Sequence, residues 1–170
     1  MPSTYTLISS NTLSATAASV TFSSIPSTFT DLVIRYAARS TDTGAYDTYV
    51  RLEMNGFVAT HSSTVIRAQG GSTGSLRSTG QVIGGYIPTA TVTSNTFGSA
   101  EFYLPNYLLT TQKTGSHFGV QENNNTTDAS VAATALLVNL TSAVTDLLLK
   151  PNAGSFVSGS SFYLYGISKS

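Results

Sequence analysis

Apolar and polar residues alternate along this chain in many short runs. In one of them Leu32, Ile34 and Tyr36 fall on one face of an extended chain, while Arg35 and Arg39 mark the solvent-facing side. Because strand side chains point alternately to two faces, such runs predict half-buried strands of antiparallel sheets. The predicted strands cover 5–9, 18–22, 31–39, 49–54, 57–59, 99–104, 115–122, 130–138, 144–149 and 161–167, and a further one begins near 81.

The last apolar run differs from the others because both of its faces are covered. Phe162 and Leu164 point to one side, and Tyr163 and Tyr165 point to the other. A strand of this kind is poorly suited to a wet edge, so we expect it to enter the middle of a sheet or a subunit contact. The predicted oligomer interface therefore consists of Phe162, Tyr163, Leu164 and Tyr165.

Turn signals separate the runs. Asn55-Gly56 predicts a type I′ hairpin, with 57–59 as its return strand, because both central positions of that turn need positive φ. From 69 to 80 the chain is rich in Gly and Ser and carries little apolar surface. We expect a long exposed loop there, and such loops are uncommon in compact domains unless they bind something.

Fold class follows from the number of short strands and the absence of a clear helix. The run 130–138 is ambiguous because Ala and Leu favour helices, but it lacks the charged outer face of a surface helix. We predict one all-β domain over 1–170, an antiparallel β-sandwich of jelly-roll type.

Charge is scarce in this chain. Only 9% of residues are charged, the formal net charge is zero, and 25 Ser and 26 Thr supply most of the polarity. Nucleic-acid binding depends on clustered Lys and Arg, which the chain lacks, so we expect no nucleic-acid partner. No apolar run approaches the roughly 18 residues of a membrane span, and no signal sequence is visible, so we expect no membrane association.

Catalytic and metal-binding patterns are weak. His61 and His117 have no ligand neighbours at metal spacing, and with no Cys a thiolate site is excluded. The segment 42–47 lacks the alternating oxygens of a calcium loop, and Glu101 with Glu122 has no sequence context that indicates a glycosidase. We therefore predict no enzyme, no catalytic residue, no metal and no cofactor.

The nine Tyr residues have two interpretations. Most are explained by cross-strand packing within sheets. Aromatic rings at loops also stack on sugars, and Tyr46, Tyr49 and Tyr86 are the candidates for glycan stacking.

Four blocks of the chain resemble small virion structural proteins of tailed bacteriophages, particularly phages of aquatic hosts including cyanobacteria. These blocks are 5–13, 22–35, 100–107 and 159–167. The resemblance implies a virion protein, either a capsid decoration (cement) protein that clamps major capsid subunits or a head- or tail-fibre module, and a homotrimer. The fibre alternative would bind host surface glycans.

Under the decoration hypothesis, flexible segments that fold on docking would contact the capsid. These are an N-terminal arm, 1–6, and the Gly-rich loop. The predicted capsid contacts are Pro2, Ser3, Thr4, Tyr5, Gly70, Gly71 and Gly74.

Overall fold

Residues 4–56, 61–124 and 128–168, which the computed structural model describes, form twelve β-strands and no helix. The strands are β1 (Tyr5–Thr12), β2 (Val20–Phe22), β3 (Asp31–Ala38), β4 (Asp47–Met54), β5 (His61–Gln69), β6 (Ser72–Thr79), β7 (Ile83–Pro88), β8 (Gly98–Leu104), β9 (Lys113–Gln121), β10 (Ser130–Val138), β11 (Leu147–Pro151) and β12 (Ser161–Ile167).

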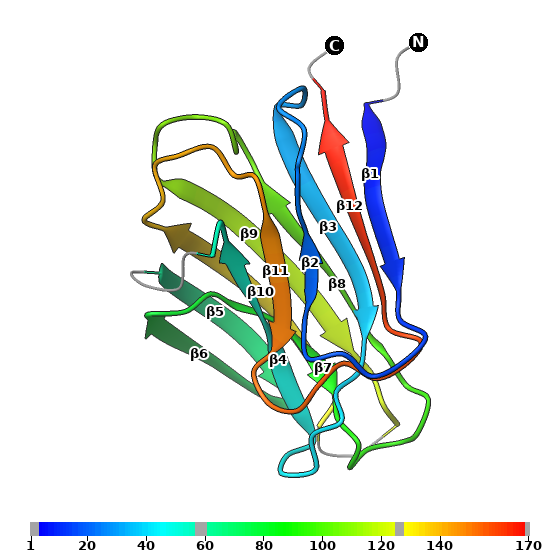
Figure 1. Cartoon of the computed structure of the whole chain (residues 1–170). Helices are drawn as coiled ribbons and strands as arrows, with labels where there is room; N and C mark the ends of the chain where they lie inside the picture. Colours follow the sequence, from blue (N-terminus) through cyan, green and yellow to red (C-terminus); the bar gives the residue numbers. More distant parts are fainter. Residues whose placement is uncertain (1–3, 57–60, 125–127, 169–170) are drawn as a thin grey trace.

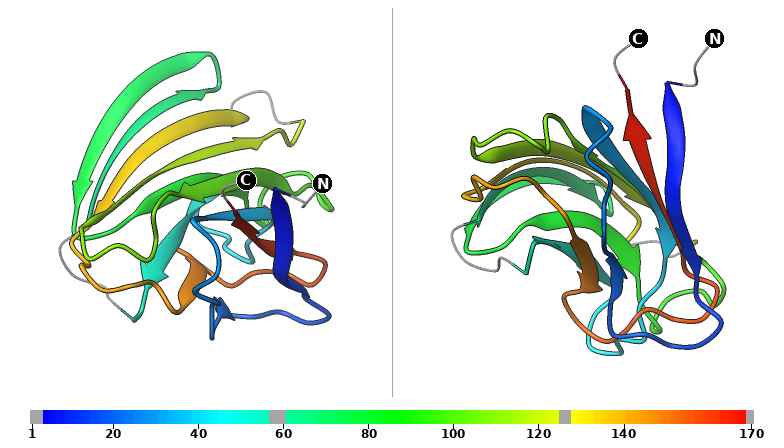
Figure 2. Two further views of the ribbon diagram at one scale, coloured as in Figure 1. Left: turned by 90° about the horizontal axis from the view of Figure 1, so that it is seen from above. Right: turned by 45° about the horizontal axis from the view of Figure 1, so that its top comes forward.

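The strands form two antiparallel sheets that pack as a sandwich (Figure 1). The larger sheet has eight strands in the order β1-β12-β3-β8-β9-β10-β5-β6, and the smaller has four in the order β2-β11-β4-β7. Figure 2 shows the larger sheet curving over the smaller one. The predicted all-β antiparallel sandwich is confirmed. The jelly-roll type is not confirmed, because a jelly roll has eight strands in two Greek keys and this fold divides twelve strands into eight and four.

One large core lies between the sheets, because each strand directs alternate residues inward. Leu32, Ile34 and Tyr36 of β3 are buried, as the alternation predicts. Burial of each large apolar side chain contributes roughly 1.5–3 kcal/mol, so this core is the main source of stability. Other fully buried members from both sheets include Val50, Met54, Phe102, Val138, Leu147, Leu149, Phe162 and Leu164.

The C-terminal strand lies inside the larger sheet. β12 pairs with β1 on one side and with β3 on the other. β12 is second from the edge of this sheet, so the prediction that the last strand does not lie at an edge is confirmed. Figure 1 shows β1 and β12 side by side, with the two ends of the chain at the same end of the sandwich.

The prediction of a Gly-rich loop over 69–80 is wrong. The structure has a hairpin there, in which β6 pairs with β5 from Ser62↔Thr79 to Gln69↔Ser72. Gly70 and Gly71 make the turn with φ of 54° and 83°, values that Gly adopts without strain. Almost every β6 residue is exposed, so backbone pairing rather than burial holds this strand.

Asn55 and Gly56 have the predicted positive φ angles, but the turn does not join β4 to a neighbouring strand of its own sheet. Both residues have positive φ, 51° and 66°. The neighbours of β4 are β11 and β7, so β4 and β5 belong to different sheets, and the expected return strand 57–59 lies outside the described residues. The Asn55 side chain instead binds the segment before β11, accepting the N–H of Thr145 at 2.8 Å and donating to the carbonyl of Ala143 at 2.8 Å.

Two further expectations are corrected. Tyr5 and Thr6 are not part of an arm, because β1 begins at Tyr5 and pairs with β12. Arg39 is 6% exposed rather than solvent-facing. Its guanidinium donates to the carbonyls of Val92 at 2.9 Å and Thr93 at 2.7 Å, and so it organises the β7–β8 loop.

Candidate interaction surface

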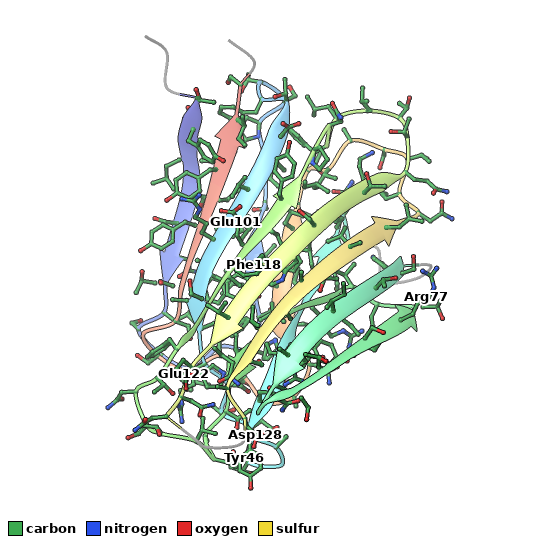
Figure 3. The ribbon with its side chains drawn as sticks, turned by 180° about the vertical axis from the view of Figure 1, so that it is seen from behind. Tyr46, Arg77, Glu101, Phe118, Glu122 and Asp128 are labelled. Atoms are coloured by element: carbon green, nitrogen blue, oxygen red, sulfur yellow. The ribbon has the colours of Figure 1, made fainter. Side chains whose placement is uncertain are left out.

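The outer side of the eight-stranded sheet carries a group of exposed apolar side chains. Ile66, Phe118, Val120 and Val131 are 68%, 56%, 40% and 39% exposed, and with Ala133 they form what we call the apolar patch. Strand register brings them together, because Ala133 lies opposite both Ile66 and Phe118, and Val131 lies opposite Val120. Figure 3 shows this side, with Phe118 near its middle. Contiguous apolar side chains on an exposed face are typical of contacts with another molecule.

Next to the apolar patch is a depression of about 410 Å³ over β12, β3, β8 and β9, which we call the outer hollow. Its floor is a cross-strand row of small residues: Ser161, Ala37 and Ser99. The neighbouring row consists of long side chains: Tyr163, Arg35, Glu101 and Phe118. The hollow exists because the register aligns small residues in one row and long residues in the next.

An ion pair lies in the centre of the long row. Arg35 Nε donates to Glu101 Oε2 at 2.7 Å, and the side chains are 55% and 41% exposed. The Arg35 guanidinium also lies 5.6 Å from the ring centroid of Tyr5 and 5.9 Å from that of Tyr165. The hydrogen bond to Glu101 is the main cause of a raised Arg35 pKa. About half of each side chain is therefore open to solvent on the outer side of the sheet.

The predicted interface residues divide between two environments. Phe162 and Leu164 are fully buried in the core, so these two cannot contact another subunit and that part of the prediction is corrected. Tyr163 and Tyr165 lie on the outer side, where both line the outer hollow. The physical reason is the alternation of β12 in a sheet that has the second sheet on only one face.

The described capsid-contact candidates lie in or next to β1 and in the β5–β6 hairpin, and β1 and β6 are at opposite edges of the larger sheet. Pro2 and Ser3 lie outside the described residues, Thr4 is exposed, and Tyr5 is a β1 residue 45% exposed. Gly70 and Gly71 form the β5–β6 turn, and Gly74 lies within β6 with open space around its Cα.

The three candidate glycan-stacking tyrosines do not form an exposed platform. Tyr86 is 7% exposed, and the Arg67 guanidinium lies 3.6 Å from its ring centroid. Tyr49 packs edge-on against Tyr86 with centroids 6.0 Å apart. Tyr46 is 50% exposed and lies at the end of the sandwich where Figure 3 also labels Glu122 and Asp128.

His117 is buried where β7 of the smaller sheet packs on β9 of the larger sheet. Its Nε2 lies 3.0 Å from the backbone nitrogen of Gly85, which can only donate, so Nε2 is an acceptor and the neutral ring carries its proton on Nδ1. Burial lowers its pKa to about 3. A Cβ on Gly85 would overlap the His117 ring and lie 3.1 Å from the Cα of Gly119, so only Gly permits this contact. His117 thus holds β7 against β9.

A second buried polar group is the ion pair of Asp47 and Arg67. Their side chains are 10% and 16% exposed, and Arg67 also covers Tyr86. Burial raises the pKa of Asp47 to about 6, although Arg67 opposes the shift. The pair links β4 to β5, and therefore joins the two sheets.

The described ranges hold neither a metal cluster nor a membrane-spanning helix. Within them, no three His, Asp or Glu side chains gather closely enough to hold a metal ion. In the 42–47 segment, Asp42 Oδ1 accepts the N–H of Gly44 at 3.2 Å, which is a local turn contact. The same ranges also contain no helix long and apolar enough to cross a bilayer.

Neither the apolar patch nor the outer hollow was predicted from the sequence. One signal was present in β9, where Phe118 and Val120 alternate with His117 and Gly119. The structure exposes the apolar pair and buries His117, which is 2% exposed. An apolar set on the solvent side of a strand indicates an interaction surface.

Comparison with known proteins gives little further information. No family model and no curated protein matches the chain. Among solved structures, it is similar to exo-inulinase from Aspergillus awamori, with a TM-score of 0.47 and 10% sequence identity. The match covers 96% of this chain and 29% of that protein, so this chain spans less than a third of its length.

Proposed function

We propose that this chain is a virion structural protein of a tailed bacteriophage, a capsid decoration protein that binds assembled major capsid subunits noncovalently and resists internal pressure. The observation that carries the proposal is the apolar patch on the outer side of the larger sheet. A decoration protein needs a folded domain with one face that packs on the shell, and it needs no catalytic or metal site. The virion setting comes from the resemblance of the four sequence blocks.

The composition supports packing as the mode of attachment. With 9% charged residues and a net charge of zero, the chain has little means of long-range electrostatic steering. Binding energy must then come from apolar contact at the patch, where Ile66 is 68% exposed. We also propose a homotrimer, because three subunits around a closed symmetry axis bury an apolar surface without open-ended polymerisation.

Copy number in purified virions separates decoration from the alternative, a head- or tail-fibre module that binds host glycans. Quantitative mass spectrometry should find this chain at a level comparable with the major capsid protein. A few copies per particle would favour the fibre alternative. Absence from washed particles would contradict both.

A binding assay tests the patch itself. Purified protein should sediment with shells that lack it, and the double variant Ile66→Ser with Val131→Ser should lose most of this binding. Leu109→Ser is the matched control, because Leu109 is 51% exposed but lies in the β8–β9 loop. Equal binding by the patch variant, with an unchanged melting curve, would refute a docking role for the patch.

A further inference from the structure

The outer hollow has the dimensions of a small-ligand site rather than of a flat packing surface. Its volume of about 410 Å³ is within the range of roughly 300–1,000 Å³ common for ligand pockets. The long row beside it crosses four strands, β12, β3, β8 and β9, and therefore spans three strand spacings, roughly 14 Å. A row of this length can contact more than one ring of a short oligosaccharide.

The charges of the hollow favour a neutral ligand. Arg35 and Glu101 neutralise one another, so the pair supplies no net attraction for an anion or for a cation. Among the described residues, the Nε to Oε2 contact is the single hydrogen bond of either side chain. The Nη groups of Arg35 can therefore donate, and Glu101 Oε1 can accept, which suits adjacent hydroxyls on one ligand.

The ends of the row supply apolar contact. Phe118 and Tyr163 lie at opposite ends of it and both line the hollow. Aromatic faces pack against the apolar C–H face of a sugar ring, while the hydroxyls at its edge remain free for polar partners. Ser99 and Ser161 add hydroxyls on the floor, and Ala37 between them leaves room for the ring.

We infer that the outer hollow is a binding site for a neutral saccharide, with Arg35 and Glu101 bonding adjacent hydroxyls and with Phe118 and Tyr163 packing on the rings. This site differs from Tyr46, Tyr49 and Tyr86, the tyrosines that the sequence suggested for glycan binding. It shares Phe118 and Val120 with the apolar patch, so a saccharide and the shell would compete for this part of the outer face, whereas Arg35, Glu101 and Tyr163 belong to the hollow alone.

Titration of the isotope-labelled full chain tests the inference by NMR. The probes are cellotetraose, maltotetraose, chitotriose and a mannotriose, with a tetragalacturonate as the anionic comparison. At least one neutral probe should shift the backbone amides of Ala37, Ser99 and Ser161, and the anionic probe should bind more weakly. Shifts confined to other strands, or no shift with any neutral probe, would overturn the inference.

Two variants and a matched control establish the site. Glu101→Gln should weaken binding about tenfold, because the ligand's hydrogen bond to a carboxylate is replaced by a weaker one to a neutral amide oxygen. Ala37→Leu should abolish binding by filling the hollow, whereas Ala135→Leu, the same change on an exposed β10 position outside the hollow, should not. Equal affinity in all three, with wild-type melting curves, would refute the site. Shell binding by the same variants shows whether the decoration proposal fails or survives separately.

Discussion

The Tyr36 hydroxyl lies 3.0 Å from Nε2 of His117 in the interior of the sandwich. That nitrogen also accepts the N–H of Gly85, so the ring is neutral, and burial lowers its pKa to about 3. In the unfolded chain the same group takes up a proton near pH 6.5. Between these values the unfolded state binds more protons than the native state, so stability from His117 is present above pH 6.5 and is lost as the pH falls toward 3.

We predict that His117→Gln weakens this acid dependence, since Gln keeps an acceptor for Gly85 but does not titrate. The free energy of unfolding of the wild type minus that of the variant should fall by ~1.4 kcal/mol per pH unit between pH 6 and 4. Urea unfolding at several pH values measures it. A difference that is constant across this range would show that the native His117 ring accepts a proton normally.

Asp47 should change the stability with pH in the opposite direction to His117. Burial raises its native pKa to about 6, above the ordinary value of 3.8, so the native state binds more protons between these values. Stability from this group is present below pH 4 and is lost as the pH rises through 6. Relative to Asp47→Asn, the wild type should therefore gain up to ~3 kcal/mol from pH 7 to 4 in the same urea experiment. A wild type that instead loses stability relative to Asp47→Asn from pH 7 to 4 would contradict the assigned pKa shift.

The packing of β7 on β9 gives a third prediction. Gly85→Ala should destabilise the fold by ~1–3 kcal/mol or more, because the new Cβ would overlap His117 and crowd Gly119. Gly74→Ala is the matched control, since no atom lies within 4 Å of the position that its methyl group would take, and the change should stay within ~0.5 kcal/mol. Thermal melts of both proteins suffice. Equal melting temperatures would mean that the sheets separate easily at this point.

A fourth prediction concerns assembly through the outer side of β12. The double variant Tyr163→Ser with Tyr165→Ser should remain folded, because neither side chain lies between the sheets, and it should change the proposed trimer into a monomer at micromolar concentration. Because both tyrosines also line the outer hollow, the trimer contact and a saccharide use the same surface, and a bound saccharide should shift the protein toward the monomer. Light scattering distinguishes 17.8 kDa from three times that mass. Tyr46→Ser, at an exposed loop Tyr, should leave the trimer intact. A wild-type protein that is monomeric at every concentration would refute the trimer in solution.

Strands whose burial alternates could be predicted from the sequence alone. β10 has the predicted bounds, Ser130–Val138, and β3 buries the predicted face with Leu32, Ile34 and Tyr36. In these segments local pattern and tertiary burial agree, so the residue types carry the information. In β12 the period of two places Phe162 and Leu164 on one face, but both faces are apolar, so only the position of the second sheet determined that this face is buried.

The hairpin of β5 and β6 could not be predicted in the same way. β6 is exposed on both faces, so no apolar period marks it, and its pairing depends on backbone hydrogen bonds that any residue except Pro can donate. The sequence there is rich in Gly, Ser and Thr, with Leu76 as its one large apolar residue. An exposed loop and an exposed hairpin contain the same residue types, so composition cannot distinguish them.

The candidate site was decided by tertiary structure alone. Phe118 is exposed and His117 is buried because Gly85 and Gly119 let β7 approach β9 and present a backbone donor to the imidazole. The ion pair of Arg35 with Glu101 joins residues 66 positions apart, which meet only because β3 lies beside β8. The sequence by itself determined which strands have an apolar face. Register and sheet order, which arise from long-range pairing, determined which side chains stand next to one another on the outer face.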